Sequence, residues 1–120
     1  MSDPFKPAAG AEGCLSDESK LSGRSAGICF PATPEEAAAA VKYARDKGYP
    51  LTLQGGLTGI VGGAVPDDTR IINTSRLKRI GPVRDDNTLY VDAGVSLDEL
   101  RGYISPKGLY FPPDPTETSA

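Results

Sequence analysis

A glycine-rich stretch between Gln54 and Pro66 is the part of this chain best suited to hold a ligand. Five of the nine residues from Gly55 to Gly63 are glycine, and the stretch contains no Lys, Arg, Asp or Glu. Glycine costs a regular element about 0.5–1 kcal/mol relative to alanine, so this density indicates positive φ angles or close approach by another molecule. Any ligand would be held by backbone N–H groups and by the Thr58 hydroxyl.

Successive backbone N–H groups can bind an anion without a side-chain cation. Each charge-assisted hydrogen bond contributes about 1.5–3 kcal/mol, so a few of them would hold a pyrophosphate. The glycine spacing does not match the dinucleotide fingerprint at a helix start, and Ala64 and Val65 stand where a P-loop needs Lys and then Ser or Thr. The residues alone leave two interpretations open: an anion site, or a plain tight turn between strands.

The other residue types offer no catalytic or metal-binding constellation. The chain has no histidine, which excludes a His-based triad and an ordinary Cys/His zinc site. Cys14 and Cys29 are expected to be free thiols, with Cys29 buried in a strand. No carboxylates are arranged as a general acid–base pair, and three tyrosines are expected to pack rather than to catalyse: Tyr90, Tyr103 and Tyr110.

A strand–helix–strand unit is predicted to position the glycine stretch. The apolar residues 26–31 predict a buried strand, and a helix over 34–47 follows, with Thr33 as its N-cap and Glu36 completing a capping box. Residues 50–54 predict a second strand, which such a crossover makes parallel to the first. The glycine stretch therefore leaves the carboxyl end of a parallel strand, where open α/β sheets bind ligands.

Less regular segments are expected around this unit. Residues 1–25 predict an irregular arm, interpreted as a solvated lead-in, with a strap over a partner or over another part of the protein as the alternative. Ile71 and Ile72 mark a further strand, so the connection from Gly55 to about Thr69 is long enough to indicate a function.

Residues 80–91 predict a hairpin, and residues 97–104 predict a short helix with Ser96 and Glu99 as its capping box. The tail 109–120 is stiffened by proline. The fold class is α+β with α/β character, built on a small mixed sheet.

Composition narrows the range of partners. A net charge of −3 with no run of Lys or Arg gives no footprint for nucleic acid. No apolar stretch approaches the ~18 residues of a transmembrane helix, and the N-terminus lacks the pattern of a signal peptide. A cytoplasmic location is therefore expected.

Six motifs follow one another along residues 28–120. They are Pro31-x-Thr33-Pro34-Glu35-Glu36, Gln54-Gly55-Gly56-Leu57-Thr58-Gly59, Gly63-Ala64-Val65-Pro66, Asn73-Thr74-Ser75-Arg76-Leu77, Val91-Asp92-Ala93-Gly94-Val95 and Phe111-Pro112-Pro113-Asp114-Pro115. Taken together and in this order, they resemble the FAD-binding domain of the vanillyl-alcohol oxidase / p-cresol methylhydroxylase (PCMH) flavoprotein superfamily. Within it the likeness is greatest to FAD-linked 2-hydroxy acid dehydrogenases, the relatives of glycolate oxidase and D-lactate dehydrogenase.

This resemblance implies that FAD is the ligand of the glycine stretch. Its pyrophosphate would be bound by the backbone N–H groups of residues 55–59 and the Thr58 hydroxyl, flanked by Gln54 and Gly63, while the proline-rich segment would lie along the flavin. Some family members attach FAD covalently through a histidine, and Leu57 stands at that position, so non-covalent FAD is expected. The implied cofactor-binding residues are Gln54, Gly55, Gly56, Leu57, Thr58, Gly59, Gly63, Pro113, Asp114 and Thr118.

The resemblance also implies that residues 26–120 are the first part of a longer FAD-binding domain, without the second subdomain and the substrate cap. The missing part would come from the same enzyme or from a complementing chain. The 120 residues alone are not expected to catalyse. The alternatives are a stand-alone α/β interaction module and an inactive fragment that binds no cofactor.

Overall fold

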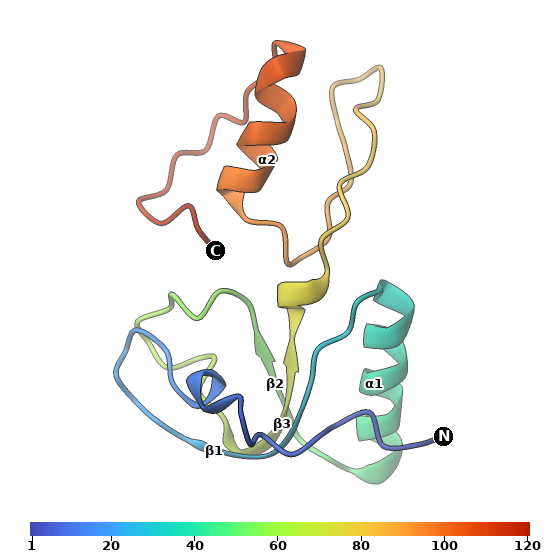
Figure 1. Cartoon of the computed structure of the whole chain (residues 1–120), viewed down its shortest axis with the longest axis vertical. Coiled ribbons are helices and arrows are strands. Elements are labelled where there is room, and N and C mark those ends of the chain that lie inside the picture. Colours follow the sequence, from blue (N-terminus) through green and yellow to red (C-terminus); the bar gives the residue numbers. More distant parts are fainter.

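A three-stranded parallel sheet forms the base of the computed structural model, which describes residues 1–120 (Figure 1). Its strands are β1 (Arg24–Cys29), β2 (Leu51–Gln54) and β3 (Asp67–Asn73), in the order β1-β3-β2. Both pairings are parallel, as the strand–helix–strand prediction requires. The expected mixed sheet differs in one respect, because the antiparallel pairs are isolated bridges outside the three strands.

Helix α1 (Pro34–Lys47) covers one face of this sheet and has the predicted bounds. Thr33 caps it by accepting a hydrogen bond from the Glu36 N–H at 3.2 Å. The Glu36 carboxylate accepts from the N–H of Ala32 at 2.7 Å, one residue earlier than a capping box requires. Gly48 ends the helix in the left-handed conformation at φ 69°.

The hydrophobic core lies between α1 and the sheet. Ala40 and Ala44 are fully buried against Ile72 of β3, and Leu51 of β2 packs against the same cluster. Phe5 completes the cluster with 6% of its surface exposed. Small side chains on α1 let the helix lie close to the strands, and the N-terminal arm supplies the large aromatic ring.

The N-terminal arm is therefore less solvated than the sequence predicts. The N–H of Lys6 donates to the carbonyl of Ile28 at 2.9 Å, and the Ile28 N–H returns a bond of 2.8 Å, so this segment adds to the β1 edge of the sheet. A 3₁₀ turn over Glu12–Leu15 follows, and Asp17 is buried. Burial of the Phe5 ring in the core contributes about 1.5–3 kcal/mol toward holding the arm on the sheet.

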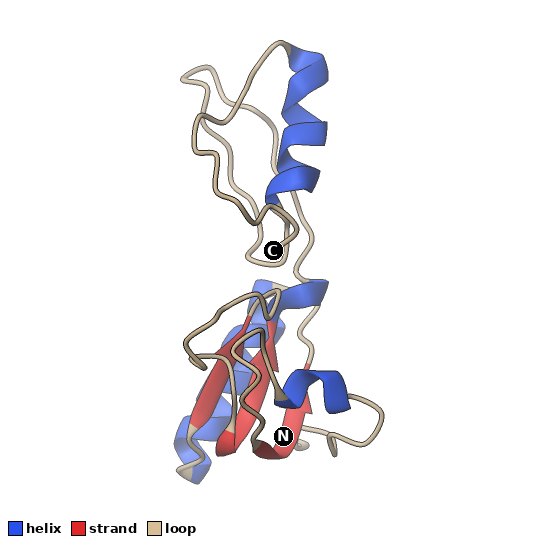
Figure 2. Cartoon of the chain, turned by 90° about the vertical axis from the view of Figure 1, so that its left-hand side faces the viewer, coloured by secondary structure: helices blue, strands red, loops and turns tan.

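The second face of the sheet carries polar side chains. Successive strand residues point to opposite faces, so Thr52 and Gln54 lie on the side away from α1. Both are buried there, with Asn73 of β3 beside Gln54. Figure 2 shows the N-terminal arm and the loop after β2 in front of this face, while α1 lies behind the sheet.

A second group of elements extends from the end of β3, beyond a 3₁₀ turn over Thr74–Arg76 (Figure 1). The predicted hairpin forms a ribbon in which Gly81 donates to Tyr90 and Asp92 donates to Arg79, each at 2.8 Å. Helix α2 (Leu97–Ile104) has the predicted bounds, and its capping box is complete. A 3₁₀ turn over Ser105–Lys107 follows, and the tail then returns alongside α2 toward the sheet. No helix combines the length and the apolar character needed to cross a membrane.

Candidate functional site

The glycine loop, defined here as Gly55–Pro66, joins the carboxyl end of β2 to the start of β3. Leu57 adopts a left-handed conformation with φ 61°, and Gly62 does so with φ 78°. The backbone N–H groups of residues 55–59 donate no hydrogen bond within the chain. A run of unpaired donors around a left-handed residue is the arrangement of an anion-binding nest. The loop therefore fits the pyrophosphate of the implied cofactor.

Gln54 fixes the start of this loop. Its side chain is only 1% exposed. Its Nε2 donates to the carbonyl of Cys14 at 2.6 Å and to that of Ala64 at 2.9 Å, and its Oε1 accepts from Asn73 Nδ2 at 3.1 Å. The amide is thus fully used inside the protein. Gln54 ties the two ends of the glycine loop to the arm and to β3, which is a positioning role.

The N-terminal arm also buttresses the loop from the side. The Glu18 N–H donates to the Leu57 carbonyl at 3.3 Å. Asp17 is buried, and its Oδ1 accepts from the N–H of Ser19 at 2.8 Å and from the Ser19 hydroxyl. Its Oδ2 has no partner and lies 3.8 Å from the position that a Cβ on Gly59 would take. No motif marks Asp17 in the sequence, because its burial results from how the arm packs.

Two cavities meet at the loop. One has a volume of about 280 Å³ and is called the phosphate cavity below; nine residues line it. The other has about 390 Å³, lies between the arm and the loop, and includes Gly56 and Leu57 in its lining. Gly56 faces both. The phosphate cavity is lined by Gly55, Gly56, Thr74, Ser75, Lys78, Ala93, Gly94, Ser119 and Ala120.

The lining of the phosphate cavity suits an anion. It contains N–H groups, hydroxyls and one cationic side chain, Lys78, and no Asp or Glu. The Nζ of Lys78 contacts Glu99 Oε1 at 3.1 Å and Oε2 at 2.8 Å. This contact, helped by the Ser96 N–H, lowers the pKa of Glu99 to about 2. Sequence reasoning missed Lys78 because it considered cations only within the glycine stretch.

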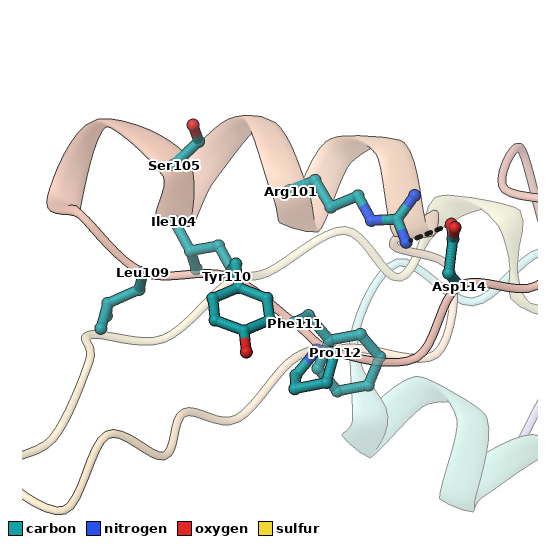
Figure 3. Close-up of a pocket in the computed structure, with 8 residues that line it drawn as sticks. All are labelled: Arg101, Ile104, Ser105, Leu109, Tyr110, Phe111, Pro112 and Asp114. Carbon is teal, nitrogen blue, oxygen red and sulfur yellow. Dashed lines mark hydrogen bonds and ion pairs between the residues drawn. The ribbon is translucent and has the colours of Figure 1, made fainter.

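Pro113, Asp114 and Thr118, which the resemblance assigns to the flavin side, lie along α2. The Arg101 guanidinium donates from Nη2 to the Pro113 carbonyl and to Asp114 Oδ1, both at 2.9 Å, so this segment lies against α2 (Figure 3). The carbonyl of Thr118 accepts from the Asp98 N–H at 3.1 Å, at the start of α2. The tail reaches the glycine loop at Ala120, two residues after Thr118. A Cβ added to Gly56 would lie only 2.6 Å from the Cβ of Ala120.

The other predicted site residues differ in how closely they approach the cavities. Thr58 is half-buried, and its hydroxyl makes no hydrogen bond within the chain. Gly63 is exposed in the turn closed by the Val65 N–H and the Gly62 carbonyl, and it lines neither cavity. The structure thus gathers residues 55–57 at the two cavities, whereas Thr58, Gly59 and Gly63 are not part of either lining.

A third cavity, of about 410 Å³, lies between α2 and the tail (Figure 3). Tyr110, Phe111 and Pro112 line it together with Ile104, while Arg101 and Asp114 form an ion pair at one end. Flat aromatic surfaces of this kind suit an apolar or aromatic group.

The thiols and the acidic groups add no further chemistry at this site. Cys14 and Cys29 are both free, and burial raises the pKa of each, with the Glu36 carboxylate contributing at Cys29. Thiols with raised pKa are poor nucleophiles at neutral pH. No cluster of His, Cys, Asp or Glu side chains could hold a metal ion.

Comparison with known proteins identifies the family. Residues 25–119 match the family model described as FAD binding domain, so the chain belongs to this family of flavoproteins. D-lactate dehydrogenase of Archaeoglobus fulgidus is 35% identical over 94 residues, which are 78% of this chain and 21% of that protein. The mitochondrial D-2-hydroxyglutarate dehydrogenase of Bos taurus is 31% identical over 94 residues, covering 77% of this chain and 17% of that protein.

The fold also recurs among solved structures. A structure of glucooligosaccharide oxidase from Acremonium strictum, described as carrying 6-S-cysteinyl, 8α-N1-histidyl FAD, superposes with a TM-score of 0.72 at 21% identity. The superposed region covers 87% of this chain and 23% of the oxidase chain. The chain spans about a fifth of the length of the two dehydrogenases. These likenesses confirm the PCMH-type fold and the relation to 2-hydroxy acid dehydrogenases that the motifs predicted.

Proposed function

We propose that the glycine loop binds the pyrophosphate of non-covalent FAD, as part of an FAD-linked oxidoreductase that oxidises a 2-hydroxy acid. One observation carries this proposal: the five consecutive backbone N–H groups from Gly55 to Gly59 are unpaired, and the first two belong to residues that line the phosphate cavity, whose lining has no acidic side chain. The names of the dehydrogenase relatives support the substrate class. The absence of histidine from the chain supports non-covalent attachment.

The residues of this chain would bind and orient the cofactor. Residues 55–59 would donate to phosphate oxygens, and the Thr58 hydroxyl would add a further donor. Gln54 and Asp17 would act indirectly, because they hold the loop and the arm in place. Bound FAD would supply the hydride-accepting chemistry. The catalytic groups that act on the substrate would lie in the rest of the enzyme.

The surface of the chain also bears on its partners. Several large apolar side chains are exposed, including Ile60 at 76%, Val61 at 87% and Tyr110 at 81%. Exposed apolar groups near a cofactor site are typical of surfaces that another part of the protein covers. We therefore expect a further segment of the enzyme, or a complementing chain, at this surface. A cytoplasmic location is also part of the proposal, although several relatives, the Bos taurus enzyme among them, are named as mitochondrial.

Titration of the chain with FAD, followed by flavin fluorescence and thermal shift, tests the function. Binding is expected to be weak, because the chain supplies only part of the site, and ADP should compete whereas riboflavin, which has no phosphate, should not. Gly55→Val is the informative variant, since a Cβ at Gly55 meets no atom of the chain within 4 Å and the fold should tolerate it. Because Gly55 lines the phosphate cavity, the branched side chain would nevertheless hinder the close approach of a phosphate to the backbone and should weaken binding.

Gly102→Ala is the matched control, because a Cβ at this helical glycine also meets nothing within 4 Å and Gly102 is remote from the cavity. It should bind FAD as the unaltered chain does. If the unaltered chain shows neither a change in flavin fluorescence nor a thermal shift with FAD, the fragment has no independent cofactor site, and an interaction module becomes the better interpretation.

A further inference from the structure

The phosphate cavity contains a cation that the glycine loop itself lacks. Lys78 follows the 3₁₀ turn after β3 and lines the same cavity as Gly55 and Gly56. Thr74 and Ser75 of that turn line it as well. The turn thus brings one ammonium group and two hydroxyl-bearing residues to the cavity that the unpaired N–H groups border.

The position of the ammonium group is set by α2. Both oxygens of Glu99 contact Lys78 Nζ, and Glu99 Oε2 also accepts from the Ser96 N–H at 2.7 Å. Glu99 is therefore held by the helix that it caps. About half of each side chain is exposed, 49% for Lys78 and 46% for Glu99. An ion pair this exposed contributes at most about 1 kcal/mol to stability, so replacing either partner should leave the fold intact.

We propose that Lys78 is a phosphate-binding residue of the cofactor site, and that its ion pair with Glu99 limits how strongly it binds. This inference rests on the proposed function. A pyrophosphate in the cavity would compete with the Glu99 carboxylate for the same Nζ, since a compact ammonium group has a limited number of donors. Glu99 would thus act through Lys78, as a competitor of the phosphate for its ammonium group.

Two substitutions should change ligand binding in opposite directions. Lys78→Ala removes a charge-assisted hydrogen bond and should weaken binding of FAD and of inorganic pyrophosphate about tenfold. It should also reduce the salt dependence of binding, because one charge interaction is lost. Glu99→Gln should strengthen binding a few-fold, because it frees Lys78 while glutamine still serves in a capping box.

Lys42→Ala is the matched control. Lys42 is also an exposed lysine paired with a carboxylate, Asp46 at 2.5 Å, but it lies on α1 and does not line the phosphate cavity. Its substitution should leave ligand binding and its salt dependence unchanged. Circular dichroism of all three variants should show the fold retained, since each altered side chain is substantially exposed.

The measurements are dissociation constants for FAD and for inorganic pyrophosphate at several salt concentrations. Opposite shifts in Lys78→Ala and Glu99→Gln support the proposal. If both variants weaken binding alike, or if neither changes it while the unaltered chain still binds FAD, the ion pair is only structural and the inference fails, although the proposed function stands. If the unaltered chain binds neither FAD nor pyrophosphate, both are overturned.

Discussion

Individual residues divide into those that meet the ligand and those that hold the loop. The backbone N–H groups of residues 55–59 are unpaired and can donate to a ligand. The Gln54 side chain cannot, because its amide group is hydrogen-bonded to Cys14, Ala64 and Asn73 inside the protein. Asp17 has one carboxylate oxygen that is hydrogen-bonded to Ser19 and one that is buried without a partner. A buried oxygen without a partner costs stability, whereas the bonds of the other oxygen to Ser19 hold the arm beside the loop.

We predict that Asp17→Ala lowers the stability of the chain without ligand by about 1–2 kcal/mol, because the Ser19 N–H and hydroxyl both lose their acceptor. Urea denaturation measures this change. Asp85→Ala, at an exposed turn, is the control and should change little. Equal stability of Asp17→Ala and the unaltered chain would show that these bonds to Ser19 do not form in solution.

Glu99 gives a prediction for pH. Its pKa is lowered from 4.5 to about 2, chiefly by Lys78 and then by the Ser96 N–H. A carboxyl whose pKa is lowered by folding stabilises the protein above its unfolded pKa, and this contribution is lost as the pH falls through the folded value. The loss should therefore fall between about pH 4.5 and pH 2.

Urea denaturation at pH 7 and at pH 2.5 measures this contribution. The stability lost between these pH values should be smaller in Glu99→Gln than in the unaltered chain. Equal losses in the two proteins would mean that the Lys78–Glu99 contact does not form in solution.

At the scale of elements, α1 supports the sheet and α2 supports the segments that follow β3. Helix α1 fixes the sheet through small side chains, and Ala40 and Ala44 leave no room against Ile72. Helix α2 holds Glu99 and receives the tail through Arg101 and through the N–H of Asp98. Both helices begin at side-chain caps, which local sequence alone determines.

We predict that Ala40→Leu destabilises the chain by about 1–3 kcal/mol, because the larger side chain overpacks the contact between α1 and the sheet. Chemical denaturation measures the change. Ala38→Leu on the exposed face of α1 is the control and should stay within about 0.5 kcal/mol of the unaltered chain. Equal effects of the two substitutions would show that α1 does not pack on the sheet as described.

How far the sequence predicts this structure depends on whether the determining contacts are local. Both helices and the parallel strands on either side of α1 could be predicted, because caps and apolar runs act over a few residues. The burial of Phe5 and Asp17 could not, since both depend on how the arm meets the sheet and the loop. The same holds for Asp114, which pairs with Arg101 through the return of the tail.

The candidate site also combines features that local sequence determines with features that depend on distant contacts. The glycine loop was evident from composition, and its unpaired N–H groups are what an anion site requires. Lys78 could not be assigned to the site from sequence, because the turn after β3 brings it to the cavity. A search for cations just after neighbouring parallel strands would have found it, since the carboxyl ends of such strands meet at one edge.

In the whole molecule, the phosphate cavity lies where the sheet and its loop meet the elements that follow β3. Its lining combines the loop with the turn at residues 74–75, the segment at Ala93 and Gly94, and the end of the tail. Gly94 is essential to this meeting, because a Cβ there would lie 2.1 Å from the Thr74 carbonyl oxygen. The molecule measures 45 × 35 × 21 Å, and the tail closes back on the loop (Figure 1). The site is thus a property of the assembled chain.

Amide shifts in ¹H–¹⁵N NMR spectra during titration with FAD and with inorganic pyrophosphate test the central claim most directly. Our account predicts that the N–H signals of residues 55–59 move downfield most strongly with both ligands, because these donors acquire phosphate partners. Thr74, Ser75 and Lys78 should follow, while amides of α1 remain unchanged. Shifts confined to other segments, or none at residues 55–59 when FAD is bound, would contradict the assignment of the glycine loop as the pyrophosphate site.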